Sequence, residues 1–249
     1  MYKGIAGSEG IGIGKVVIIE EKEINIETKK IEDTDAELNR LQEGIEKFVE
    51  ATNAMADRMD ETVGKKDADI LRGHIQMLQD PMIEEQISSL IIAEKITAEM
   101  AVDQVLEQTA EMFSQIPDEL LQQRATDFRD IKTRMLKILL GIEDVDISQV
   151  PAGTVIVARD LTPSMTAGIN PENIEGILTE VGGRTSHSAI LARAMEVPAV
   201  LSIENICSIA KNGDKVVLDG TSGEAILNPD DETVEKFKKM YSDYQNEKA

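Results

Sequence analysis

The sequence contains very little cysteine, histidine or aromatic side chain. Among its 249 residues are one Cys, two His and no Trp, and only 3% are aromatic. The single thiol, Cys207, excludes an internal disulfide framework and favours a reducing, cytosolic compartment. One Cys and two His are also too few for a zinc cluster of the usual kind. We expect Cys207 to be a buried small hydrophobic residue, because nothing near it would activate a thiol.

Positive charge is scarce too. Lys and Arg number 26 against 47 Asp and Glu, which gives a formal net charge of −21. This balance argues against nucleic acid or an anionic membrane as partner, since both must be neutralised by basic side chains. It fits a partner with a basic face, attracted by electrostatic steering. An acidic surface that only keeps the protein soluble explains the composition at least as well.

Long apolar runs are also missing. No stretch is long enough to span a membrane, and the first residues lack the cationic start and continuous apolar segment of a signal peptide. Together with the single cysteine, this predicts a soluble cytoplasmic protein.

The middle of the chain, from Asp33 to about Gly141, has the pattern of charged amphipathic helices. Apolar residues at three-and-four spacing from Leu38 to Met59 predict one long helix, with Thr34 and Glu37 as its capping box. Further helices are predicted over 67–78, 82–92, 97–116 and 118–140, separated by glycine and proline signals. The short connections predict an all-helical block with antiparallel neighbours.

Strand-like segments occupy the two ends of the chain. They are predicted at 14–20, 154–158, 175–179, 199–203, 214–218 and 224–227, the last two joined by a hairpin loop over 219–223. The early strand needs a sheet to join, and only the C-terminal half offers one. We therefore predict a discontinuous α/β domain over 1–22 and 144–230. A helical subdomain over 31–143 is inserted into it, and a charged linker helix follows over 231–249.

The glycine-rich start does not fit a nucleotide-binding loop. Gly7, Gly10, Gly12 and Gly14 precede a strand, whereas a dinucleotide fingerprint follows a strand and opens a helix. We interpret these glycines as loop flexibility.

The run GGRTSHSAILARAMEVPAV, residues 182–200, contains one of the two histidines. Thr185 or Ser186 is a good N-cap, so His187 should fall in the first turn of a helix. Backbone N–H groups at a helix start attract anions, and two glycines allow a bulky ligand to approach closely. Arg184 and Arg193 would add charge-assisted contacts to a phosphate.

Three interpretations of His187 follow from this chemistry. A neutral imidazole can act as a nucleophile and accept a phosphoryl group, stabilised by the helix start and nearby hydroxyls. Acyl transfer with Ser186 or Ser188 is the rival, but no G-x-S-x-G elbow occurs. A merely structural histidine near a helix cap is the third, and physical reasoning alone favours it over the other two.

The full string adds a resemblance. GGRTSHSAILARAMEVPAV resembles the phosphohistidine segment of the family that uses phosphoenolpyruvate as phosphoryl source: Enzyme I of the sugar phosphotransferase system, pyruvate phosphate dikinase and phosphoenolpyruvate synthase. Four other stretches are similar to Enzyme I in particular: GIAGSEGIGIGKV at the start, ILRGHIQMLQDPMI (70–83), RATDFRDIKTRML (124–136) and RDLTPSMTA (159–167). The resemblance covers almost the whole chain.

The resemblance implies an α/β phosphohistidine domain interrupted by a helical subdomain that docks the phosphocarrier HPr. His187 would take a phosphoryl group derived from phosphoenolpyruvate and pass it reversibly to a histidine of HPr during bacterial sugar uptake. Thr166 matches the threonine that hydrogen-bonds and orients the imidazole. The expected phosphate-binding residues are Arg184, Thr185, Ser186, Ser188 and Arg193.

Complete Enzyme I also carries a C-terminal barrel domain that binds phosphoenolpyruvate and magnesium and mediates dimerisation. The chain is similar to the N-terminal half alone. We therefore expect a monomer without a metal or cofactor of its own, which exchanges phosphate with HPr but does not phosphorylate itself from phosphoenolpyruvate.

Partner-binding residues are expected in the helical block. Met77, Ile83 and Leu121 match positions that line the HPr groove, and Arg124 matches a charged one. From spacing alone, packing of the three apolar side chains inside the bundle is the stronger interpretation. His74, the other histidine, lies on the apolar side of its helix and is predicted to be a hydrogen-bonded core residue without a metal.

Two alternatives remain open. One is a non-catalytic docking module whose α/β part is only a scaffold. The other is the swivelling phosphohistidine domain of a dikinase or phosphoenolpyruvate synthase, which would have no use for an HPr-docking bundle.

Overall fold

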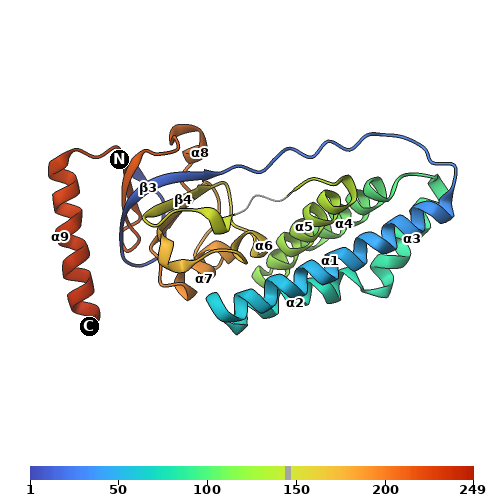
Figure 1. Ribbon diagram of the computed structural model, residues 1–249, viewed down its shortest axis with the longest axis horizontal. Helices are drawn as coiled ribbons and strands as arrows, with labels where there is room; N and C mark the ends of the chain where they lie inside the picture. The colour runs from blue at the N-terminus through green and yellow to red at the C-terminus, as the bar shows by residue number, and fades with distance from the viewer. Residues whose placement is uncertain (144–146) are drawn as a thin grey trace. The chain divides into compact units, whose positions relative to one another are not determined.

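The computed structural model describes residues 1–143 and 147–249 and forms two compact units (Figure 1). One unit comprises Met1–Glu21, Thr62–Gly64 and Val145–Ala249, and the other comprises Lys22–Glu61 and Lys65–Asp144. The first unit includes residues 231–249, which the sequence assigned to a separate linker. The predicted start of the second α/β segment at 144 lies outside the described residues.

The helical unit is built on five helices of its described part: α1 (Thr34–Thr62), α2 (Lys65–Leu78), α3 (Pro81–Glu94), α4 (Ala98–Ser114) and α5 (Glu119–Leu140). Side-chain caps at Asp80, Thr97 and Asp118 start α3, α4 and α5 by accepting backbone N–H groups of the first turn. Gly141 ends α5 in the left-handed conformation that favours glycine. The predicted helices are confirmed, with ends shifted by a few residues.

The predicted capping box of α1 is wrong. The side chain of Asp33 accepts the N–H of Ala36 at 3.0 Å, one position before the predicted cap. Thr34 is the first helical residue, and the carboxylate of Glu37 instead accepts a hydrogen bond from Arg40. Asp33 is the better cap because a carboxylate also interacts favourably with the positive helix N-terminus.

The α/β unit contains a mixed sheet in its described part. Its strands are β1 (Tyr2–Lys3), β2 (Ile5–Ser8), β3 (Ile11–Ile19), β4 (Thr154–Ala158), β5 (Ile174–Thr179), β6 (Ala199–Leu201), β7 (Lys215–Asp219) and β8 (Glu224–Leu227), in the order β1-β8-β7-β3-β4-β5-β6-β2. β3, β4, β5 and β6 are parallel, and the remaining neighbours are antiparallel. β1 and β2 lie at opposite ends of this order but are separated in the chain by Gly4 alone, so the sheet curls back on itself.

Helices cover the curved sheet. α6 (Pro163–Thr166) and α7 (His187–Ala194) contribute Met165, Ala189 and Ala192 to one apolar cluster with β4, β5 and β6. The short helix α8 (Ile206–Ile209) contributes Ile206 to a second cluster. The charged C-terminal helix α9 (Asp231–Lys248) packs on β3 and β7 through Phe237, which is almost fully buried against Ile11 and Val217.

The six predicted strands are confirmed, and β4 and β8 have the predicted ends. The hairpin between β7 and β8 is confirmed too, because Asp219 accepts the N–H groups of Thr221 and Ser222 in the loop. Loop flexibility is the wrong explanation of the early glycines, since Gly12 and Gly14 lie inside β3. A Cβ on Gly12 would lie 2.4 Å from the carbonyl oxygen of Glu175, and one on Gly14 equally close to that of Gly153. These positions require glycine because neighbouring backbone approaches them too closely for a side chain.

We predict that Gly12→Ala lowers the free energy of unfolding by about 1–3 kcal/mol, because the new methyl group must displace the backbone of β5. Gly168→Ala is the matched control in the same unit. Its Cβ would meet the side chain of Ser148 at an ordinary 3.5 Å, so its stability should stay within about 0.5 kcal/mol of the parent. Urea unfolding followed by circular dichroism measures both, and equal stability of the two variants would contradict the packing argument.

Candidate functional site

His187 is the first residue of α7, and Ser186 is the N-cap. The hydroxyl of Ser186 accepts the N–H of Ala189 at 3.3 Å and donates to the carbonyl of Gly183 at 2.7 Å. Gly182 has φ +110, and a Cβ there would lie 3.0 Å from this hydroxyl. The predicted cap and the predicted place of His187 in the first turn are both confirmed. The imidazole therefore lies at the positive end of a helix, where anions bind favourably.

Ser188 has its side chain turned away from solvent. It is fully buried, and its hydroxyl donates to Oδ1 of Asp160 at 2.8 Å while accepting the N–H of Leu161 at 3.2 Å. A contact between Ser188 and phosphate, as the sequence predicted, would require these bonds to break.

Thr166 closes α6 and is also fully buried. Its hydroxyl donates to the carbonyl of Pro163 at 2.8 Å, which leaves the oxygen lone pairs to accept a hydrogen bond. Met165 and Ala189, from α6 and α7, share one apolar cluster, so the two predicted site segments pack on the same part of the sheet. The bond from the imidazole to Thr166 stays a prediction.

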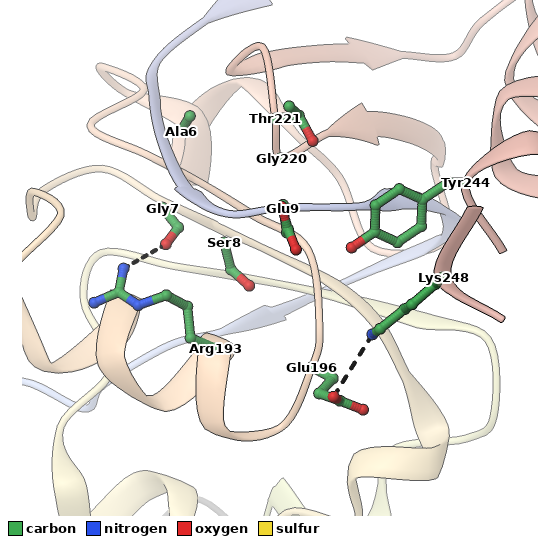
Figure 2. A pocket seen from close by; sticks show the side chains of 10 residues that line it. All are labelled: Ala6, Gly7, Ser8, Glu9, Arg193, Glu196, Gly220, Thr221, Tyr244 and Lys248. Carbon is green, nitrogen blue, oxygen red and sulfur yellow. Dashed lines mark hydrogen bonds and ion pairs between the residues drawn. The ribbon is translucent and has the colours of Figure 1, made fainter.

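Arg193 bridges two segments of the α/β unit. One guanidinium nitrogen donates to the carbonyl of Gly7 at 2.7 Å, and the other donates to the carbonyl of Arg184 at 2.8 Å. Figure 2 shows the guanidinium reaching from α7 to the strand segment at Gly7. Arg193 thus ties the loop before His187 to the segment at Gly7, and we call this pair of hydrogen bonds the Arg193 clamp. Arg184 and Thr185 are exposed on that loop.

A pocket opens beside Arg193, between α7, α9 and the loop after β2 (Figure 2). Its lining includes Glu9, Glu196, Tyr244 and Lys248. Lys248 pairs with Glu196 at 3.6 Å, so the cation and the carboxylate largely neutralise each other. The pocket therefore has no surplus of positive charge that would attract an anion. Its lining residues do not include the N-terminus of α7.

The predicted partner-binding residues of the helical unit divide by burial. Met77 and Ile83 are 9% and 7% exposed and belong to its core, as the spacing interpretation held. Leu121 is half-buried and Arg124 is exposed. Exposed apolar side chains of the helical unit were not predicted. The most exposed of those described there are Leu120 (70%) and Met82 (68%). Only their places beside the helix caps Asp118 and Asp80 could have indicated exposure.

His74 is a core residue, as predicted. It is almost fully buried on α2, and its Nε2 lies 3.0 Å from Oδ1 of Asp127 on α5. A second α5 carboxylate, Asp130, is 3.9 Å from the other ring nitrogen. This arrangement ties α2 to α5 in the helical unit.

The thiol of Cys207 is not activated as a nucleophile. Cys207 is half-buried rather than buried, and burial together with the nearby Glu180 carboxylate raises the pKa of its thiol to about 11. Within residues 1–143 and 147–249, no three His, Cys, Asp or Glu side chains are grouped as metal ligands. None of the helices described is long and apolar enough to cross a membrane.

We predict that Arg193→Met destabilises the α/β unit by about 1–3 kcal/mol, because two hydrogen bonds from a charged donor are lost. Arg193→Lys should recover only part of this loss, since a single ammonium group does not span both carbonyls. Lys248→Met removes a cation from the same pocket but only an exposed ion pair, so its effect should stay below about 1 kcal/mol. Urea unfolding measures all three, and hydrogen exchange should show added exposure at residues 182–186. A stable Arg193→Met variant would refute the clamp.

Comparison with known proteins gives a consistent result. Residues 3–124 match the family profile of the PEP-utilising enzyme, N-terminal domain, and residues 150–223 match that of its mobile domain. The chain is similar to the phosphoenolpyruvate-protein phosphotransferases of Haemophilus influenzae (37% identity) and Bacillus subtilis (36%), over 100% and 99% of its length. It spans only 44% and 43% of those two relatives.

Solved structures agree with the sequence comparison. An NMR solution structure of Enzyme I superposes with a TM-score of 0.83 at 38% identity, covering 98% of this chain and 100% of the other. The N-terminal domain of Enzyme 1 - Nitrogen shares the fold, with a TM-score of 0.59 at 21% identity. The predicted fold class, an α/β domain with an inserted helical subdomain, is confirmed. The chain belongs to the family of PEP-utilising enzymes and carries the N-terminal and mobile domains of that family.

Proposed function

We propose that this chain transfers phosphoryl groups through a phosphohistidine at His187. The phosphoryl group derives from phosphoenolpyruvate and passes reversibly to a histidine of the phosphocarrier HPr, in bacterial sugar uptake. The observation that carries the proposal is the position of His187, the first residue of a helix whose start is fixed by the Ser186 cap and the Arg193 clamp. The other histidine, His74, lies in the core of the helical unit against the carboxylates of Asp127 and Asp130.

The proposed exchange step balances without a co-reactant. The lone pair of a neutral ring nitrogen of His187 attacks the phosphorus of phosphorylated HPr, and a new P–N bond forms as the P–N bond of the donor histidine breaks. The donor ring carries a proton on its other nitrogen, so it takes back the bonding pair and leaves as neutral imidazole. His187 keeps the proton on its own other nitrogen and becomes the protonated phosphohistidine, so charge and protons balance. Because the bond broken and the bond made are of the same kind, the step is reversible. The positive end of α7 stabilises the negative phosphoryl oxygens during transfer.

We propose that phosphoenolpyruvate, the first phosphoryl donor, binds outside these 249 residues. The relatives named phosphoenolpyruvate-protein phosphotransferase are more than twice as long as the matched region. We place the binding of phosphoenolpyruvate, and of the magnesium ion expected with it, in the part of those relatives that this chain does not match. The 249 residues themselves are expected to exchange phosphate with HPr and to need no metal for that exchange.

The helical unit is the proposed docking site for HPr. The starts of α3 and α5 expose Met82 and Leu120, each within two residues of a capping aspartate. Leu121 and Arg124 follow on α5, while Met77 and Ile83 support this surface from within the core. Exposed apolar side chains bordered by carboxylates suit a basic partner, and the net charge of −21 would speed its association.

We predict that mixing the chain with phosphorylated HPr gives one acid-labile phosphate per molecule, detected by phosphorus NMR and intact mass. His187→Ala should take up none and still bind HPr, because docking is assigned to the other unit. His74→Gln is the matched control: it removes the other histidine, leaves an amide to bond Asp127, and should retain phosphate uptake.

The same measurement separates the alternatives. Uptake from phosphoenolpyruvate and magnesium by the 249-residue chain alone would overturn the assignment of donor binding. Binding of HPr with no phosphate uptake by the parent protein would favour the docking module. Phosphate retained by His187→Ala would place the acceptor elsewhere.

A further inference from the structure

A hydrogen-bonded group of one buried and one half-buried side chain, Ser188 and Asp160, lies beside His187. Oδ1 of Asp160 accepts two hydrogen bonds, from the hydroxyl of Ser188 at 2.8 Å and from the N–H of Leu161 at 2.9 Å. We propose that Asp160 and Ser188 are positioning residues for the imidazole of His187. This inference rests on the proposed phosphoryl transfer for its functional consequence.

The two residues connect the segments that carry the site. Asp160 and Leu161 lie in the loop between β4 and α6, which leads to Thr166, and Ser188 lies in the first turn of α7 next to His187. The Ser188–Asp160 bond is thus a direct side-chain connection between the segment of the proposed phosphate acceptor and the segment of the residue predicted to orient it.

The hydroxyl of Ser188 is not needed to give the buried N–H of Leu161 a hydrogen-bond acceptor. The N–H of Leu161 is already bonded to Asp160 at 2.9 Å, a shorter distance than its 3.2 Å to the Ser188 hydroxyl. Removing Ser188 would therefore leave Leu161 with an acceptor. What would be lost is the connection between α7 and the β4–α6 loop.

The surroundings make this connection rigid. Ser188 is completely inaccessible to solvent, and Leu161 and Ala189 beside it belong to the apolar cluster between the sheet and α7. Hydrogen bonds to an ionised acceptor in such a place are stronger than those exposed to water.

The hydrogen bond of Ser188 also fixes the position of His187, because the two residues are neighbours on one helix. Consecutive side chains point about 100° apart around the axis, so a bond that fixes Ser188 also fixes the direction of the imidazole. A rotation of α7 by some 10° would move the ring by about 1 Å, and a misplacement of that size costs about 100-fold in a transfer that depends on alignment.

Ser188→Ala and Asp160→Ala in the 249-residue chain test this assignment, with phosphorylated HPr as donor. Both should lower the maximal rate of single-turnover phosphate exchange about 10–100-fold, with the Kd for HPr unchanged. Asp160→Asn retains an Oδ1 acceptor and should recover most of the rate. Thr154→Val is the matched control, since it removes another buried hydroxyl of the α/β unit that bonds a backbone carbonyl, Pro151, and should exchange at the parental rate.

A second readout does not depend on phosphate. Nitrogen-15 NMR of the His187 ring, without HPr, should show one tautomer in the parent protein and a mixture in Ser188→Ala, with the parental spectrum restored in Asp160→Asn. If the parent accepts no phosphate, the proposed function fails, and this spectrum alone decides the positioning role. A Ser188→Ala variant with the parental ring spectrum would overturn the proposal. So would a Ser188→Ala variant that exchanges phosphate at the parental rate, even if its free energy of unfolding falls by as much as that of Thr154→Val.

Discussion

The α/β unit depends on β3 pairing along both of its edges. This strand, Ile11–Ile19, makes five parallel residue pairs with β4 and five antiparallel pairs with β7. Without it the sheet would fall into two halves, one with the parallel strands and one with the C-terminal hairpin. The chain supplies β3 before any other central strand and returns to β4 only at Thr154. The insertion of a whole helical unit between two paired strands is tolerable because the entropy of closing a loop rises only logarithmically with its length.

The same parallel arrangement determines where the site is built. The register pairs Ala158 of β4 with Thr179 of β5, so the two strands end side by side. Beyond that pair, the N–H of Val181 donates to the carbonyl of Arg159, which continues the connection into the loops. One loop leads to Thr166 and the other to His187. Ligands in α/β proteins bind outside the carboxyl ends of parallel strands for this reason, and here the sheet brings together two segments that are more than twenty residues apart in the chain.

Sequence reasoning succeeded where one local pattern decides the structure. The five helices of the helical unit follow from apolar spacing, and the place of His187 follows from the serine cap. It failed where a distant partner decides. β1 and β2 are short, with Gly4 between them and Gly7 inside β2, and they form because they pair with β8 and β6 at the ends of a curled sheet. The Arg193 clamp joins residues 186 positions apart, and the bond from Ser188 to Asp160 spans 28, so neither has a local signal.

These long-range hydrogen bonds determine which residues around His187 hold the structure and which are available to a ligand. Two serines flank His187, and both hydroxyls already make hydrogen bonds within the protein: Ser186 caps α7 and bonds the carbonyl of Gly183, and Ser188 bonds the carboxylate of Asp160. Under the proposed function, recognition of phosphate would then fall mainly on the backbone of the helix start and on the exposed loop with Arg184 and Thr185. A site of this kind does not need to rearrange its hydroxyls as the charge moves. Because these hydrogen bonds are in place without a phosphoryl group, little reorganisation would oppose the proposed transfer in either direction, and a carrier that both accepts and donates requires this property.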